Sequence, residues 1–145
     1  MPIWNKELQL QDVQQMGKGT MVEHTGIAIT EIGDNYLKGT MPVDHRTTQP
    51  MGILHGGASV ALAETLGSIA ANLVVDNKKN YCVGLDINAN HLRQASAGTT
   101  VTGIAKPVHI GKSTQVWSIE ILNEENQLVC ISRLTMAVLS LSARG

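Results

Sequence analysis

Alternation of apolar and polar residues in the second half of the chain predicts a series of β-strands. Residues 127–139 show it best, because Cys130, Ser132, Leu134 and Met136 would face one way while the intervening, more polar set faces the other. Similar segments predict strands at 81–89, 99–106 and 114–122. The turns between them are supplied by Gly111-Lys112 and by Asn123-Glu124-Glu125-Asn126.

The first half has a different pattern. Residues 6–16 predict a short amphipathic helix, which Gly17 and Gly19 end. Segments 26–32 and 36–41 flank the turn residues 33–35 and predict a β-hairpin. A loop containing two prolines leads to a long apolar stretch, predicted as a helix over 57–74.

A hairpin, one long helix and four further strands indicate an α+β fold with an antiparallel sheet wrapped around one central helix. A length of 145 residues suits one domain, residues 1–145. Apolar residues make up 43% of the chain and aromatic ones only 3%, so we expect an aliphatic core.

Charge and cysteine content narrow the function classes. A net charge of −1 without a basic block argues against a nucleic-acid partner. The N-terminus has no apolar segment typical of a secretory signal, and Glu64 interrupts the apolar run 58–75, which argues against a membrane span. Cys82 and Cys130 are expected to be buried free thiols, which indicates a reducing compartment and therefore the cytoplasm.

The predicted helix carries one carboxylate. At 100° per residue, Leu62, Leu66, Ile69 and Leu73 form a stripe that should pack on the sheet, and Glu64 points away from it. We expect mostly small residues around Glu64: Gly57, Val60, Ala61, Gly67, Ser68 and Ala71. An ordinary solvated face would carry Lys, Glu and Gln instead. Glu64 is either an exposed residue at a helix edge or, as this face favours, a functional carboxylate that meets a second subunit and a substrate.

The segment before this helix is rich in potential hydrogen-bond donors. Gly56 and Gly57 permit close backbone approach, and the free N–H groups of a helix start suit a carbonyl oxygen that becomes negative. The alternative is a loop that needs glycine only for positive φ. Ser59 lies in a partial Gly-x-Ser-x-Gly pattern that lacks its last glycine, so a serine nucleophile is disfavoured. The five histidines match no metal-binding spacing, so we expect no metal.

Residues 49–57, Gln-Pro-Met-Gly-Ile-Leu-His-Gly-Gly, followed by Ala63-Glu64, resemble the signature of the hotdog-fold thioesterases. The branch includes phenylacetate-degradation thioesterases and the glutamate-dependent hydroxybenzoyl-CoA thioesterases. Segments 40–44, 84–91, 103–111, 115–117 and 132–135 extend the resemblance over most of 26–139. It is greatest to the 1,4-dihydroxy-2-naphthoyl-CoA hydrolases of menaquinone synthesis. The chain departs from these relatives at 75–80 and 140–145.

This resemblance implies a role for each matching residue. Glu64 would be the nucleophile or general base, the Gly57 N–H would polarise the thioester carbonyl, Gln49 would lie near that carbonyl or the water, and His55 would orient the loop or lie near the sulfur. Ser68 would line the acyl pocket. The coenzyme A arm would contact Gly56, Gly84, His91, Leu92, Arg93, Gln94, His109, Ile110, Gly111, Lys112, Ser113 and Thr114.

The sequence thus predicts an acyl-coenzyme A thioesterase that needs no cofactor, since coenzyme A is part of the substrate. An aromatic acyl group is expected, with 1,4-dihydroxy-2-naphthoyl-CoA as candidate. Two alternatives stay open: a hotdog lyase of the dehydratase type, and a non-catalytic acyl-CoA binding protein. One sheet around one helix leaves a sheet edge uncovered, so we expect a homodimer, or a tetramer of two dimers.

Overall fold

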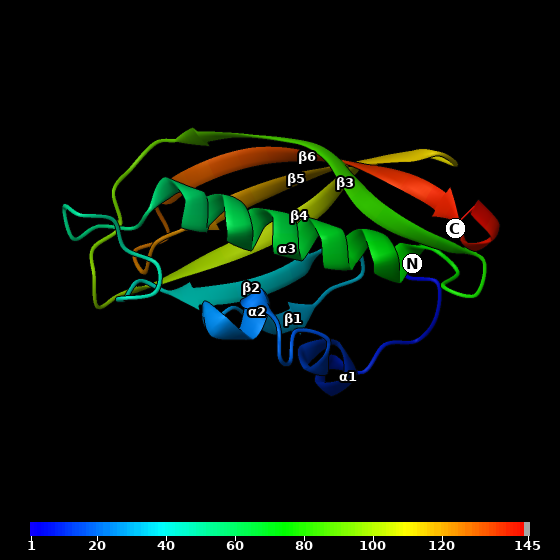
Figure 1. Ribbon diagram of the computed structural model, residues 1–145, viewed down its shortest axis with the longest axis horizontal. Coiled ribbons are helices and arrows are strands. Elements are labelled where there is room, and N and C mark those ends of the chain that lie inside the picture. Colours follow the sequence, from blue (N-terminus) through cyan, green and yellow to red (C-terminus); the bar gives the residue numbers. More distant parts are fainter. Residues whose placement is uncertain (144–145) are drawn as a thin grey trace.

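The computed structural model describes residues 1–143, whose strands form one six-stranded antiparallel sheet of order β1-β2-β4-β5-β6-β3. The long helix α3 lies across one face of this sheet (Figure 1). The elements are α1 (Leu10–Gln15), α2 (Met21–His24), β1 (Ala28–Ile32), β2 (Leu37–Pro42), α3 (Gly56–Val74), β3 (Asn80–His91), β4 (Thr100–Ile110), β5 (Thr114–Leu122), β6 (Leu128–Ser140) and a 3₁₀ turn, Leu141–Ala143. The predicted α+β architecture is confirmed.

The predicted hairpin and the four later strands are all present. The alternation in β6 is confirmed, because Cys130, Ser132, Leu134 and Met136 are all buried on the side of α3. The N-terminal prediction was less accurate. The expected helix over 6–16 forms only at Leu10–Gln15, and α2 was not predicted. The Thr20 side chain caps α2 by accepting a hydrogen bond from the Val22 N–H, so a threonine followed three residues later by Glu23 was the missed signal.

Helix α3 packs on the sheet through a wider face than its large apolar residues indicate. Leu62 and Leu66 are fully buried as predicted, whereas Ile69 is half-buried and turns toward the N-terminal segment. Gly67 and Ala71 were predicted to flank Glu64 but are buried. A Cβ atom on Gly67 would lie only 2.6 Å from Leu134 Cδ2, so Gly67 faces β6.

The physical reason is the curvature of the sheet. A sheet that wraps around a helix contacts more of its circumference than a flat sheet would, and small residues are needed where the strands come nearest. The sheet also carries small residues where it meets α3. Gly39 and Gly103, paired across β2 and β4, form a recess for the Leu66 side chain. Added Cβ atoms there would lie 2.8 and 2.6 Å from the Leu66 methyl carbons.

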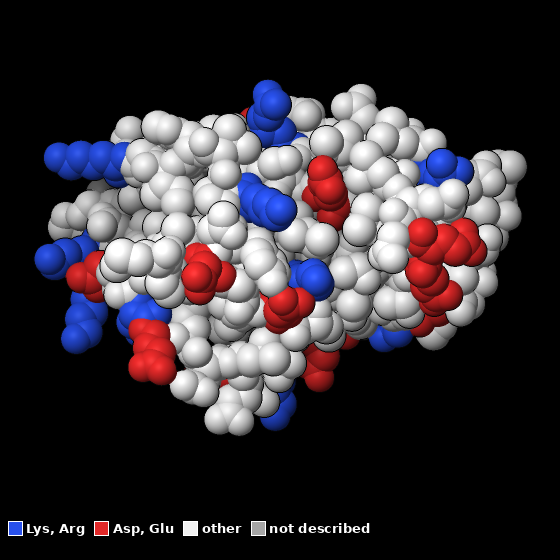
Figure 2. Space-filling view, turned by 180° about the vertical axis from the view of Figure 1, so that it is seen from behind, with Lys and Arg blue, Asp and Glu red and all other residues white. Residues whose placement is uncertain are grey.

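The opposite face of the sheet carries basic and acidic side chains that are interspersed among uncharged ones (Figure 2). Helix α3 is long and apolar enough to cross a membrane by composition alone. Its large apolar side chains, however, pack on the sheet, which is the arrangement of a core helix.

Candidate active site

Glu64 lies in the middle of α3 with its side chain exposed, directly above the edge strand β3. A Cβ atom built on Gly84 would lie 2.7 Å from Glu64 Oε1, so the carboxylate rests on the bare backbone of that glycine. No hydrogen bond or ion pair joins Glu64 to another residue within 1–143. The structure therefore leaves this carboxylate free to accept a proton or to attack an electrophile.

His55 caps the N-terminus of α3. Its Nδ1 atom accepts a hydrogen bond from the Gly57 N–H at 2.8 Å. A nitrogen that accepts a hydrogen bond carries no proton, so this contact requires the tautomer with its N–H at Nε2. This bond also occupies the amide that was predicted to polarise a carbonyl, so Gly57 can serve only when His55 rotates away. The neighbouring Gly56 N–H has no partner in the described part of the chain and is the donor already available.

A hydrogen-bonded loop holds His55 in place. The Thr47 hydroxyl donates to Pro42 O (2.6 Å) and accepts from Asp44 N (3.0 Å), while Thr47 O accepts the His55 N–H (2.8 Å). The Arg46 guanidinium beside Asp44 lowers the pKa of that carboxyl to about 2, so the pair stays charged at any ordinary pH. The helix start is thus anchored to the end of β2.

The Gln49 side chain is engaged within its own loop. Its side-chain oxygen accepts the Met51 N–H inside a small turn that Gly52, at φ 79°, helps to close. The main chain of Gln49 completes the turn by bonding Ile53 O and the Gly52 N–H, each at 2.9 Å. The side-chain nitrogen of Gln49, Nε2, makes no hydrogen bond within the described residues and can donate to a partner outside this loop.

The predicted coenzyme A contacts fall into two groups. A hollow of about 240 Å³ gathers Gly56, His91, Leu92, Arg93 and Gln94, together with the buried Ser59. The imidazole of His91 packs on Gly56, since an added Cβ there would lie 3.0 Å from His91 Nε2.

The second group comprises residues 109–114 and lies elsewhere. It forms the β4–β5 turn, closed by a hydrogen bond from the Gly111 N–H to Thr114 O (2.8 Å). Thr114 and Gln115 align with Ala137 and Met136, which in turn pair with Val83 and Gly84. This turn is therefore near the Gly84 end of the sheet, whereas His91 marks the opposite end of β3. One chain does not bring the two groups together.

A second hollow, of about 420 Å³, lies beside Glu64 between α3 and α2. Ser68, the residue expected to line an acyl pocket, is among its lining residues. The other lining residues, most of them apolar, are Thr20, Met21, Val22, Ile27, Ala61, Thr65 and Ile69. Sequence reasoning did not predict the wall formed by residues 20–22, because it did not predict α2.

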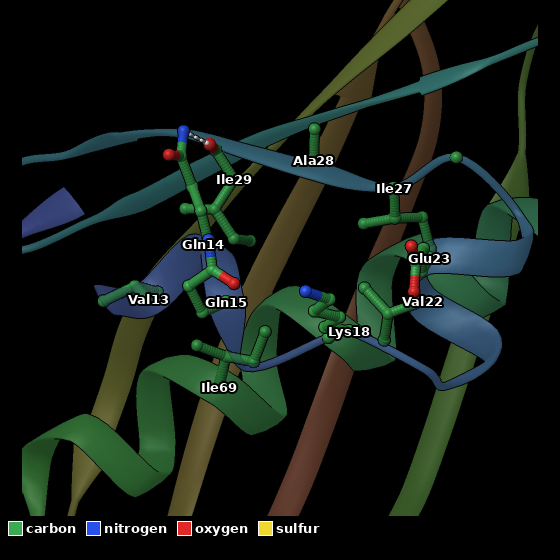
Figure 3. Close-up of a pocket in the computed structure, with 12 residues that line it drawn as sticks. Val13, Gln14, Gln15, Lys18, Val22, Glu23, Ile27, Ala28, Ile29 and Ile69 are labelled. Carbon is green, nitrogen blue, oxygen red and sulfur yellow. Dashed lines mark hydrogen bonds between the residues drawn. The ribbon is translucent and has the colours of Figure 1, made fainter. Parts of the chain in front are cut away.

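A third hollow, of about 410 Å³, continues beyond this wall under α1 (Figure 3). It shares Val22, Ile27 and Ile69 with the hollow at Glu64, and these three side chains separate the two. Lys18 and Glu23 are among its lining residues, and Gln14 Nε2 donates to Ile29 O (2.8 Å). The carboxylate therefore faces a mainly apolar hollow whose far wall is formed by α2, Ile27 and Ile69.

Comparison with known proteins defines the class. The model of the thioesterase superfamily matches residues 51–130, which contain α3, β3 and the helix-start loop. The chain belongs to this superfamily, and its sheet and central helix are the hotdog thioesterase fold. It is a thioester hydrolase.

Individual relatives are similar over almost the whole chain. The 1,4-dihydroxy-2-naphthoyl-CoA hydrolase of Escherichia coli (strain K12) is 50% identical over 94% of this chain and 99% of its own. The proofreading thioesterase EntH of Cronobacter sakazakii is 48% identical over 94% and 98%. The crystal structure of the Q49A mutant of thioesterase PA1618 from Pseudomonas aeruginosa has a TM-score of 0.93 at 45% identity, covering 96% of this chain and 99% of that one.

Proposed function

We propose that this thioester hydrolase acts on an aromatic acyl-coenzyme A, with Glu64 as its catalytic carboxylate. The observation that carries the proposal is the unpaired Glu64 carboxylate, which lies on Gly84 and opens into a mainly apolar hollow. A hollow of about 420 Å³ lies within the usual size range of small-molecule sites. The flat ring of an aromatic acyl group would enter between α2 and α3, with Ser68 at its side.

Two routes are chemically balanced. In one, a Glu64 oxygen attacks the thioester carbon, coenzyme A leaves as a thiolate, and water hydrolyses the resulting anhydride. In the other, Glu64 takes a proton from water while the water oxygen attacks the same carbon, and the thiolate again leaves. In both, the carbonyl oxygen becomes negative and requires N–H donors, which Gly56 supplies, together with Gly57 when His55 turns aside. Neither route needs a metal or a further cofactor.

A single chain cannot supply both halves of this site. Gly57 and Glu64 are seven residues apart on one helix, which places them roughly 10 Å apart along its axis. A reacting carbon must instead lie about 3 Å from the attacking atom, with its oxygen at a similar distance from the donors. We therefore propose that Glu64 of one protomer works with the helix start, Gln49 and His55 of its partner.

Strand β3 is the edge through which such a homodimer would form, and two dimers would give a tetramer. Antiparallel pairing of two β3 strands about a two-fold axis brings the Gly84 end of one near the partner's His91 end. The same operation brings the partner's 109–114 turn toward the hollow formed by His91 and Arg93. Both predicted coenzyme A groups would then contact one substrate.

The identity of the acyl group and the cellular setting rest on the relatives. The Escherichia coli relative carries the name of a 1,4-dihydroxy-2-naphthoyl-CoA hydrolase, and this compound is our candidate substrate. A role in menaquinone synthesis would follow from that activity. The EntH name instead suggests a proofreading role. Cys82 and Cys130 are buried free thiols, which suits the proposed cytoplasmic location.

The deciding experiment is Glu64→Gln with release of free coenzyme A followed by a thiol dye. The substitution keeps shape and removes charge and basicity, so kcat/KM should fall by roughly 10²–10⁴-fold while the fold and coenzyme A affinity persist. Ser68→Ala, which changes the pocket wall, is the matched control and should lose less. Thiol release by the wild type also separates hydrolysis from the lyase and binding alternatives, which release none. An intact Glu64→Gln dimer within a few-fold of wild type would remove Glu64 from the mechanism.

A further inference from the structure

Asn72 makes an unusual set of hydrogen bonds between α3 and the edge strand β3. Its Oδ1 accepts the Cys82 N–H at 2.8 Å, and its Nδ2 donates to Cys82 O at 3.1 Å. The same Nδ2 donates to Ser68 O at 2.9 Å, which fixes the side-chain rotamer. The carboxamide thus pairs with both main-chain groups of one strand residue, as a neighbouring strand would.

This contact divides the β3 edge into two parts. The strand runs from Asn80 to His91 and has β6 on one side only. Asn72 occupies the hydrogen-bonding groups of Cys82, and no other side chain in the described chain bonds the main chain between Gly84 and His91 on the free side. Only the portion from Gly84 onward is open to a second strand, and it begins with a bulge between Gly84 and Asp86.

The open portion has the character of an interface. Leu85 in this portion is apolar yet 62% exposed, and Val83, just before it in the strand, is also apolar and exposed. An unpaired edge with exposed apolar residues is a template for another strand. The strand can pair in antiparallel orientation with the same strand of a second copy of this chain. A second copy is therefore the partner that would pair the free main-chain groups of β3.

We infer that Asn72 sets the register of the sheet that two protomers would form through their β3 strands, because it blocks strand pairing at Cys82. This inference rests on the proposed homodimer and its two-chain active site. A slip by one residue would turn each inward side chain outward, so the nearest competing register is two residues away, a displacement of roughly 7 Å. Such a slip would carry the partner's helix start away from Glu64. Asn72 is in this sense a positioning residue, far from the reacting atoms.

Asn72→Ala in the full chain tests the idea. Alanine frees the Cys82 main-chain groups and is a better helix former than asparagine, so α3 itself is not weakened. Asn77→Ala is the matched control, because Asn77 Nδ2 donates to Asn72 O (3.0 Å) without bonding β3. Asn72→Asp keeps an acceptor for the Cys82 N–H but loses both donors, so it should lie between Asn72→Ala and the wild type.

The register is read by pulsed electron spin resonance. A spin label on Glu125→Cys, in the exposed β5–β6 turn, gives one label-to-label distance per dimer, because both native thiols are buried. Asn72→Ala should add or shift to a distance that differs by several ångströms, up to about 7 Å. Its kcat/KM should fall by about tenfold or more at unchanged dimer content. Asn77→Ala should match wild type in both readouts.

An Asn72→Ala dimer with the wild-type distance overturns the register role, whatever its activity, and so does one that separates into monomers. A monomeric wild type overturns both this inference and the proposed assembly. A dimeric wild type that releases no thiol, but whose label distance shifts in Asn72→Ala, refutes the proposed function and leaves the register role standing.

Discussion

Gly84→Ala should separate catalysis from folding, because it changes the space around one carboxylate and little else. The new Cβ would lie 2.7 Å from Glu64 Oε1, whereas ordinary contact begins at 3.4 Å, so the carboxylate must move by at least about 0.7 Å. A 1 Å misplacement of a reacting group costs up to roughly 100-fold in rate. We therefore expect kcat/KM to fall by about 10- to 100-fold, or about 1.4–2.7 kcal/mol in activation free energy.

The fold should tolerate this change. Gly84 is not among the glycines with positive φ, and the crowding atom is the end of a flexible, exposed side chain. Alanine also lowers the entropy of the unfolded chain, so the free energy of unfolding in urea should be unchanged or up to about 1 kcal/mol higher. Ser118→Ala, a similarly small change on β5, should alter neither quantity.

A double-mutant cycle sharpens this test. Glu64→Asp retracts the carboxylate by one methylene and relieves the crowding, so its added cost in the Gly84→Ala protein should be smaller than its cost in wild type. The kinetics are followed by free-thiol release on one aromatic acyl-CoA. A stable Gly84→Ala dimer with wild-type kcat/KM would show that the position of Glu64 on this glycine has no bearing on the reaction.

Two further predictions concern the core. Leu66→Ala should lower the free energy of unfolding by about 2–5 kcal/mol, and Gly103→Ala should lower it by about 1–3 kcal/mol. The double mutant should lose less than the sum of the two, because alanine at 103 enters the space that Leu66 vacates. Strict additivity in urea melts would contradict that packing. Burial raises the pKa of Cys82 to about 11 from its ordinary value of 9, and also raises that of Cys130. Neither thiol should react with a thiol dye in the native protein at pH 8, and both should react in urea. The thiol of the unfolded chain ionises at a lower pH than the buried Cys82 thiol. The contribution of buried, protonated Cys82 to the free energy of unfolding is therefore full below pH 9 and is lost between pH 9 and about 11. Urea melts over that pH range should show the stability falling as the pH rises.

Periodicity in the sequence was sufficient for the strands, the long helix and their α+β arrangement, because each pattern arises within one element. It also made Glu64 a candidate catalytic residue, since a lone carboxylate in an apolar helix is visible without any tertiary contact. The same reasoning failed at Gly67 and Ala71. Their place on the helical wheel is local, but which part of the wheel is buried depends on how far the sheet curves around α3.

Other parts of the site depend on segments that are distant in the chain. The hollow at Glu64 needs α2, a four-residue helix too short to show periodicity. The bond between His55 and the Gly57 N–H follows from one rotamer at a helix cap. The contact between Asn72 and Cys82 joins a helix to an edge strand across a loop. Sequence determined which elements form, because periodicity is a property of neighbouring residues. Tertiary structure decided which carboxylate, amide and sheet edge are left without a partner, because that depends on how the elements close around one another.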